Sequence, residues 1–333
     1  MIDQATINAL RGEAISEQKL FIDGNWTESR SGARDDVVSP IDGQVLTQVA
    51  AADESDVDRA VAAARKSFES GVWSRCEPAF RKKILHRIGD LIEKHANQLA
   101  VLGVRDNGTE MQMAFGAEPG SSAGTFHYSA ECVDKLYGEI APTSDKILGL
   151  IHHAPVGVVG VIVPWNTPLM ITAWKIGAAL AVGNSVVLKP SEDACLNVLA
   201  LARLCAEAGL PEGILNVVTG SGAIVGDAIA RHMDVDVVAF TGSGRVGRAL
   251  LEASAQSNMK RVYLELGGKS PNIVFADAPD LDKAAMISAK GFFKNSGQIC
   301  VAPSRLLVED SIKEEFVARI VDHAKSIKVG DPL

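Results

Sequence analysis

Val156-Gly-Val-Val-Gly-Val-Ile-Val163 opens the stretch of sequence that decides the fold, residues 155–270. Runs of valine, isoleucine and leucine alternate there with longer segments whose apolar residues recur at helical spacing. The later strand-like runs are Ser185–Pro190, Ile214–Gly220, Asp236–Gly242 and Arg261–Gly268. Strands that are apolar throughout and separated by helices are typical of a parallel sheet with helices on both faces. The sequence therefore predicts an α/β protein with a Rossmann-type sheet.

The chain on either side of this stretch has a different pattern. Residues 1–50 are predicted to form an irregular arm with short strands, including alternation around an Asp-Gly turn at Leu20–Trp26. Residues 53–137 have apolar positions at helical spacing and predict several helices. After residue 270, a helix-like segment at 281–293 and a strand-like segment at 304–310 follow.

The composition argues against several classes of protein. The 333 residues are 47% hydrophobic and 22% charged, which suits a globular chain of two domains or one large α/β unit. A net charge of −8 without a lysine and arginine cluster argues against nucleic acid or an anionic membrane as partner. The N-terminus lacks a signal-peptide pattern, and the longest apolar stretch, Val156–Val163, is too short to span a bilayer. Five cysteines without paired spacing or histidine patterns predict neither disulfides nor a metal site, so we expect a cytoplasmic protein.

Polar and glycine-rich motifs follow five consecutive strands of the predicted sheet. Ligands of such sheets bind outside the carboxyl ends of the strands. The motifs are Pro164-Trp165-Asn166, Lys189-Pro190-Ser191-Glu192, Thr219-Gly220-Ser221-Gly222, Thr241-Gly242-Ser243-Gly244 and Glu265-Leu266-Gly267-Gly268. We therefore expect a ligand site at this edge.

The turn Gly242–Gly247 has the spacing G-x-G-x-x-G between a strand and a helix. Glycines there let backbone N–H groups approach a phosphate at the start of the helix. Turn geometry alone also explains a glycine-rich loop, but the position of this one favours contact with a phosphate or a dinucleotide.

Four charged or amide side chains at the strand ends have more than one interpretation. Glu265 could hold a ribose hydroxyl or act as a base facing a cleft. Lys189 and Glu192 could bind ribose hydroxyls or bind each other. Asn166 could donate to an oxyanion or cap the helix that follows it. The spacing does not choose between these interpretations.

The segment Phe292–Arg305, FFKNSGQICVAPSR, places Cys300 between a predicted helix and a predicted strand. A cysteine on such a turn can expose its sulfur while its backbone N–H points toward the atom that the sulfur attacks, which suits a nucleophile. A free cysteine is more often a buried, inert apolar residue. The segment alone leaves both interpretations open.

Together these stretches resemble the NAD(P)-dependent aldehyde dehydrogenase superfamily, from Phe21-Ile-Asp-Gly-Asn-Trp26 to the last residue. Leu264-Glu-Leu-Gly-Gly-Lys-Ser-Pro271 is similar to the glutamate signature of the family. Phe293-Lys-Asn-Ser-Gly-Gln-Ile-Cys300 is similar to its cysteine signature. The two motifs occur in the family's order.

The resemblance implies a role for each residue. Cys300 would be the nucleophile, Glu265 the base for the deacylating water, and Asn166 with the Cys300 N–H the donors to the oxyanion. NAD would accept the hydride, and no metal is implied. The residues implied to bind NAD are Trp165, Lys189, Ser191, Glu192, Gly222, Gly242, Ser243, Gly244, Val246, Gly247 and Leu266. Glu192 would disfavour NADP because its carboxylate repels a 2′-phosphate.

Some positions depart from the family pattern. Arg245 follows the second glycine of the turn, where glutamate is common, and could alter the cofactor preference. Thr167 stands where many relatives have an aromatic residue. The expected result is a wider or more polar substrate channel beside Ile171, Trp174, Ile299 and Val301.

The resemblance also predicts the organisation of the chain. Residues 1–266 would form the NAD-binding domain, with part of an oligomerisation arm near 139–156. Residues 267–333 would begin a catalytic domain whose remainder is absent, since members of the family continue beyond this point and form homo-oligomers. The runs Ser257–Arg261 and Ile273–Asp277 are similar to bacterial members that act on aminoaldehydes such as γ-glutamylaminobutyraldehyde.

Two other functions stay open at this stage. The chain could be a catalytically silent NAD-binding or assembly subunit. It could also be an ordinary Rossmann dehydrogenase in which Glu265 binds ribose and Cys300 is structural.

Overall fold

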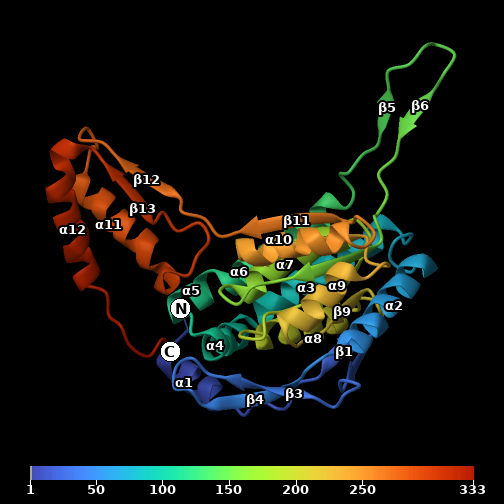
Figure 1. The fold of residues 1–333 in the computed structure, drawn as a ribbon, viewed down its shortest axis with the longest axis horizontal. Coiled ribbons are helices and arrows are strands. Elements are labelled where there is room, and N and C mark those ends of the chain that lie inside the picture. Colours follow the sequence, from blue (N-terminus) through green and yellow to red (C-terminus); the bar gives the residue numbers. More distant parts are fainter. Residues whose placement is uncertain (1) are drawn as a thin grey trace.

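A seven-stranded sheet with helices on both faces forms the centre of the protein (Figure 1). The computed structural model describes residues 2–333. Five parallel strands follow the order β11-β10-β7-β8-β9. Their bounds are β7 Val158–Ile162, β8 Ser185–Lys189, β9 Leu215–Val217, β10 Val237–Gly242 and β11 Arg261–Leu266. The α/β fold predicted from the alternation of strands and helices is confirmed.

A hairpin extends the sheet beyond β9 in the antiparallel sense. β1 (Leu20–Ile22) pairs with β9 through Phe21 and Val217, and with β2 (Asn25–Thr27). Asp23 and Gly24 connect the two strands with φ of 52° and 76°, which is the left-handed pair of a type I′ turn. The sequence predicted this hairpin but not its place in the central sheet.

Alternating side chains of the parallel strands pack on opposite faces of the sheet. Val159 and Val161 of β7 join one apolar cluster, whereas Val158 and Ile162 join another. Gly160 between them is required by packing, because a Cβ there would lie 2.5 Å from Cγ2 of Ile229. Strands buried on both faces explain why the sequence shows continuous apolar runs.

Helices from two parts of the chain cover the two faces. One face packs against α3 (Pro78–Lys94), α6 (Glu118–Cys132), α7 (Pro168–Ala181) and α8 (Leu196–Ala208). The other packs against α2 (Glu54–Ser70), α9 (Asp227–Arg231) and α10 (Gly244–Ala255). The single helix expected before β10 divides into a π-helical turn, η1 (Gly222–Gly226), and α9.

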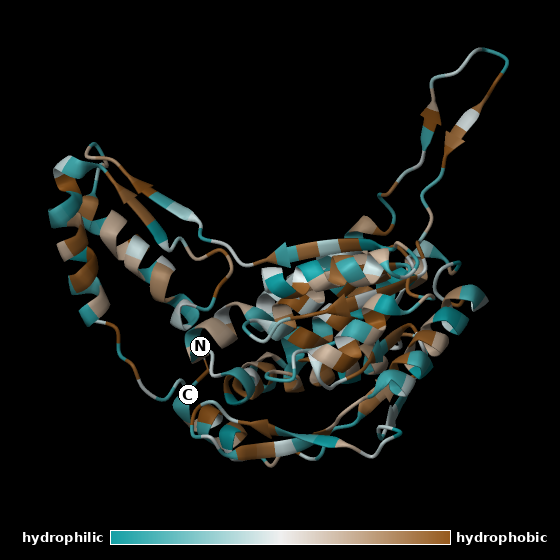
Figure 2. Ribbon diagram, in the orientation of Figure 1, coloured by the Kyte–Doolittle hydropathy of each residue, from teal (hydrophilic) through white to brown (hydrophobic). Residues whose placement is uncertain are grey.

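Smaller elements surround this centre. They are α1 (Gln4–Gly12), the pair β3 (Arg34–Val38) and β4 (Val45–Ala50), α4 (Ala96–Asn107), α5 (Met111–Gly116), and the hairpin of β5 (Glu139–Ala141) and β6 (Gly149–Ile151). The β5–β6 hairpin projects from the body of the protein and carries apolar residues (Figure 2). Within residues 2–333, no helix combines the length and the apolar character needed to cross a bilayer.

The last part of the chain forms a small unit with its own core, seen at the red end of the colour scale (Figure 1). β12 (Pro271–Val274) and β13 (Arg305–Val308) pair in parallel. α11 (Leu281–Phe293), η2 (Lys294–Gly297), η3 (Asp310–Ile312) and α12 (Lys313–Lys325) complete the unit. The predicted domain boundary after residue 266 precedes β12, and its assignment to NAD-binding and catalytic domains stays a prediction.

Candidate active site

Four segments that contain predicted site residues meet at the carboxyl edge of the parallel sheet. Ile162, the last residue of β7, pairs with Phe240 of β10 and with Lys189 of β8. Glu265 at the end of β11 pairs with Thr241 of β10. The parallel direction of the strands therefore brings their polar carboxyl ends to one side of the molecule.

Cys300 lies on the loop that connects α11 to β13. The backbone reverses sharply before it, with left-handed φ angles of 52° at Asn295, 54° at Ser296 and 76° at Gly297. The thiol of Cys300 is free and exposed, while Cys195 and Cys205 are buried. Burial raises the pKa of Cys205 to about 12. Cys76 and Cys132 are half-buried, so Cys300 is the most exposed of the five thiols, and its role as a nucleophile stays a prediction.

The segment after Glu265 contacts the Cys300 loop. A Cβ built on Gly268 would lie 3.5 Å from the carbonyl oxygen of Cys300. The N–H of Arg305 donates to the carbonyl of Ser270 at 3.2 Å. Glu265 itself is exposed at the end of the edge strand β11. Segments that are more than thirty residues apart in the sequence are therefore neighbours in the structure.

Lys175 of α7 is a charged group near Glu265 that the sequence analysis did not single out. Its Nζ donates to the carbonyl of Phe240 at 3.2 Å. Burial lowers the pKa of Lys175, and the Glu265 carboxylate acts in the opposite direction. A lone lysine inside the apolar helix LMITAWKIGAALAVG was the available signal.

The side chain of Asn166 points to the Cys300 loop. Its Nδ2 donates to the carbonyl of Gln298 at 2.8 Å. The helix that follows, α7, is capped instead by Glu118 of α6, whose Oε2 accepts the N–H groups of Leu169 and Met170 at 2.9 and 3.2 Å. The alternative that Asn166 caps this helix is therefore wrong.

Lys189 and Glu192 bind each other at the end of β8. The buried Nζ of Lys189 donates to Oε2 of Glu192 at 2.8 Å and to the carbonyl of Pro190 at 2.8 Å. The N–H of Gly222 donates to Oε1 of Glu192 at 3.0 Å. Partial burial acts to raise the pKa of Glu192, but the hydrogen bond and charge of Lys189 outweigh it and lower the pKa. Ser191 forms an isolated bridge with Ala194 beside this pair.

The turn from β10 into α10 presents an open helix N-terminus. Ser243 is the N-cap and accepts the N–H of Val246 at 3.3 Å. A Cβ on Gly244 would meet nothing closer than Nη1 of Arg248 at 3.7 Å, so a ligand can approach the backbone. A Cβ on Gly247 would lie 3.1 Å from Cδ2 of Leu266, which explains this glycine by helix–strand packing.

Gly242 has a structural explanation as well, because a Cβ there would lie 2.4 Å from the ring of Phe240.

Trp165 is 38% exposed beside the site. Thr167 and Ile171 are only 3% and 7% exposed. Trp174 and Val301, by contrast, are 50% and 70% exposed. The expected wider or more polar channel beside these residues stays a prediction.

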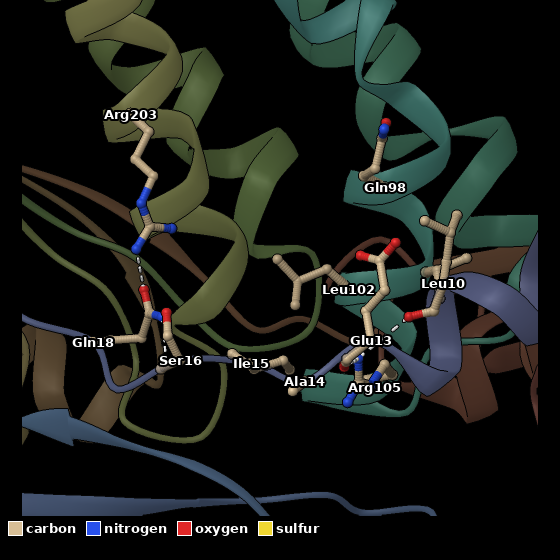
Figure 3. Close-up of a pocket in the computed structure, with 11 residues that line it drawn as sticks. Leu10, Glu13, Ala14, Ile15, Ser16, Gln18, Gln98, Leu102, Arg105 and Arg203 are labelled. Carbon is tan, nitrogen blue, oxygen red and sulfur yellow. Dashed lines mark hydrogen bonds between the residues drawn. The ribbon is translucent and has the colours of Figure 1, made fainter.

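A cavity of about 220 Å³ lies among α1, α4 and α8 (Figure 3). Arg105 there donates to the carbonyls of Leu10 and Glu13, and Arg203 donates to Gln18. The predicted site residues do not line this cavity, so it is separate from the site at the sheet edge.

The fold and the sheet-edge site define an α/β protein with a dinucleotide-type turn after β10 and an exposed cysteine on a loop that contacts Asn166 and the segment after Glu265. The profile of the aldehyde dehydrogenase family matches residues 26–333. The chain therefore belongs to the aldehyde dehydrogenase family.

Individual relatives agree with this assignment. The chain is 48% identical to the NADP/NAD-dependent aldehyde dehydrogenase PuuC of Escherichia coli K12 over 95% of its own length and 64% of that protein. It superposes with a TM-score of 0.97 on the γ-glutamyl-γ-aminobutyraldehyde dehydrogenase of Burkholderia cenocepacia, at 45% identity over 99% of this chain and 67% of that one. It also superposes with a TM-score of 0.97 on a variant of the indole-3-acetaldehyde dehydrogenase AldA of P. syringae, solved with NAD+ and IAA. The identity is 46%, over 100% of this chain and 67% of that one.

The chain spans 64% of the length of the E. coli relative and about two thirds of each solved chain.

Proposed function

We propose that this chain carries the reaction centre of an NAD-dependent aldehyde dehydrogenase, which oxidises an aldehyde to a carboxylic acid. One observation carries the proposal: the exposed Cys300 lies on a loop that contacts both the Asn166 side chain and the segment after Glu265. These contacts support a site in which a nucleophile, an amide donor and a carboxylate would come from three separate parts of the chain.

The sheet edge fits a dinucleotide. Lys189 and Glu192 would hold the adenosine ribose, since an ammonium and a carboxylate at a strand end can together bind its hydroxyls. Ser243, Gly244 and the N-terminus of α10 would hold the pyrophosphate, because the space above Gly244 is open and the helix end favours negative charge. When bound, NAD+ supplies a hydride acceptor.

Cys300 would add its sulfur to the carbonyl carbon of the aldehyde, with the thiol proton released. The resulting thiohemiacetal has an oxyanion that needs fixed donors. Asn166 can supply one, because Nδ2 carries two protons and Gln298 accepts only one of them. The backbone N–H of Cys300, which makes no hydrogen bond within residues 2–333, can supply the second.

After hydride removal the product on Cys300 is a thioester, which water hydrolyses to the acid. Glu265 would take the proton from this water, since its carboxylate is exposed at the edge that the Cys300 loop contacts.

For the substrate we propose an aminoaldehyde, on the basis of the runs Ser257–Arg261 and Ile273–Asp277. The name of the B. cenocepacia relative supports this choice, and that of the P. syringae relative gives the competing aromatic aldehyde. Initial rates with γ-glutamylaminobutyraldehyde and with indole-3-acetaldehyde would decide between them.

The β5–β6 hairpin supports the proposal of a homo-oligomer. Ile140, Leu148 and Leu150 are 73%, 72% and 69% exposed there, and projecting apolar side chains are typical of an interface. The five free thiols suit a reducing compartment, so we place the protein in the cytoplasm.

The proposed reaction is tested by NADH formation from a panel of aldehydes, with the Cys300→Ser variant as control. The proposal predicts aldehyde-dependent NADH formation that the variant lacks. NAD binding without any NADH formation would favour the silent subunit instead, and equal activity in the variant would favour the ordinary Rossmann dehydrogenase.

A further inference from the structure

A buried asparagine, Asn295, joins the Cys300 loop to two other segments. Its side chain is 2% exposed and uses both amide atoms. Nδ2 donates to the carbonyl of Asn166 at 3.2 Å, and Oδ1 accepts the hydroxyl of Thr109 at 2.8 Å. Its backbone N–H donates to Oε1 of Glu110 at 3.1 Å. Asn295 is therefore fixed from three directions.

Asn166 and the Cys300 loop are connected twice. Asn295 holds the carbonyl of Asn166, while the Asn166 amide donates to the carbonyl of Gln298. Asn295 and Gln298 both lie on the loop that ends at Cys300. This pair of hydrogen bonds closes a ring between the turn after β7 and the loop after α11, so neither segment can shift alone without breaking a bond.

The loop between α4 and α5 supports the ring from outside. Asn107 donates to the carbonyls of Trp165 and Asn166 at 3.1 and 3.5 Å, and its Oδ1 accepts the N–H of Thr109. Thr109 is 3% exposed, and its hydroxyl donates to Oδ1 of Asn295, while the carbonyl of Asn166, which can only accept, faces Nδ2. A hydroxyl that donates to Oδ1 leaves Nδ2 directed at Asn166.

We propose that Asn295 is a positioning residue, oriented by Thr109, which holds the Asn166 amide and the Cys300 loop at the separation that oxyanion binding requires. The inference rests on the proposed function, and it identifies the residues that would hold the two oxyanion donors in place. The sheet and the small unit after residue 270 have separate cores, so a contact between them has to fix the distance between Asn166 and Cys300.

Asparagine suits position 295 for two reasons. The position needs one acceptor and one donor on the same planar group, which aspartate cannot offer when ionised. The backbone is left-handed, with φ of 52° and ψ of 43°, a conformation that asparagine adopts more readily than most residues. Ser296 has the same backbone, with φ of 54°, but its side chain is exposed.

The test uses the stability of the thiohemiacetal on Cys300, because this equilibrium needs the oxyanion donors but no hydride transfer. Aldehyde protects Cys300 from iodoacetamide, and peptide mass spectrometry follows alkylation at this residue. The concentration of aldehyde that halves the alkylation rate measures the affinity. The variants are Thr109→Val, Thr109→Ser, Asn295→Asp and the matched control Ser296→Ala.

We expect Thr109→Val and Asn295→Asp to weaken protection by aldehyde about tenfold, with the alkylation rate in the absence of aldehyde little changed. Thr109→Ser keeps the hydroxyl and should restore protection, and Ser296→Ala should not alter it. In an Asn166→Ala background Thr109→Val should have a smaller effect, because the Asn166 amide is then absent and only the Cys300 N–H is left to position. NADH formation should show a lower kcat in the same variants.

Protection that is equal in Thr109→Val, Asn295→Asp and the native chain would overturn the positioning role while the proposed function stands. An additive effect of Thr109→Val and Asn166→Ala would also overturn it. If aldehyde gives the native chain no protection, the proposed function fails, and the inference fails with it. Thr109→Val changes only one hydroxyl, so the test does not depend on whether Asn295→Asp folds.

Discussion

Glu118→Gln is expected to remove a large part of the pH dependence of stability. Glu118 is 1% exposed, and burial raises its pKa to about 7, although the N–H groups of Met170 and Leu169 act in the opposite direction. The ordinary pKa is 4.5. The folded state therefore holds a proton that the unfolded state has lost between about pH 4.5 and pH 7, and this group's contribution to stability falls as the pH rises through that window.

The magnitude follows from the size of the shift. A pKa raised from 4.5 to about 7 corresponds to about 3 kcal/mol at 1.36 kcal/mol per unit. Glutamine keeps an acceptor for the N-terminus of α7 but cannot ionise. The free energy of unfolding of the variant, relative to the native chain, should rise by about 2 to 3 kcal/mol from pH 5 to pH 8.

Urea unfolding at several pH values, followed by tryptophan fluorescence, measures this difference. Glu131→Gln on the same helix is the matched control, because Glu131 is exposed and its pKa is lowered by Lys82, His86 and Lys135 rather than raised. The free energy of unfolding of Glu131→Gln should differ little from that of the native chain, and this difference should not rise with pH. If the free energies of unfolding of the native chain and of Glu118→Gln changed with pH in the same way, the reasoning would be refuted. Glu118 would then ionise in the folded state as it does in water.

Two further perturbations test the nucleotide site and the backbone beside it. Glu192→Gln should improve the affinity for NADP relative to NAD about tenfold, because it removes a carboxylate that repels the 2′-phosphate; an unchanged ratio of dissociation constants would contradict the ribose role. Gly220→Ala should destabilise the fold by about 2 kcal/mol in urea unfolding, since φ is +131° and the new Cβ would lie 3.1 Å from the backbone N and O of Ala52. Gly222→Ala, whose Cβ would lie 3.8 Å from Glu192, should cost much less stability, and equal losses would count against this explanation.

Local patterns in the sequence predicted most of the fold. Continuous apolar strands between helices predicted the parallel sheet, and Asp23-Gly24 predicted the β1–β2 hairpin. The helix at 281–293 has the predicted bounds. These features depend on periodicity and turn chemistry, which act over a few residues.

Contacts between distant segments could not be predicted in the same way. The alternative uses of Asn166 could not be separated, because the group that caps α7 is Glu118, about fifty residues away. The two uses of Lys189 and Glu192, binding each other or binding ribose hydroxyls, could not be separated either. Asn295 was part of a quoted motif, but its function as a link depends on Thr109 and Asn166, which only the folded chain brings to it.

The central claim is that Cys300 forms the covalent intermediate and that Glu265 activates the water that removes it. The most direct measurement is the mass of the Cys300 peptide after the Glu265→Gln variant reacts with an aldehyde and NAD+. We expect an acyl group on Cys300 that needs NAD+, accumulates in this variant and turns over in the native chain. An acyl group on another cysteine, or none in a variant that still binds NAD+, would contradict it.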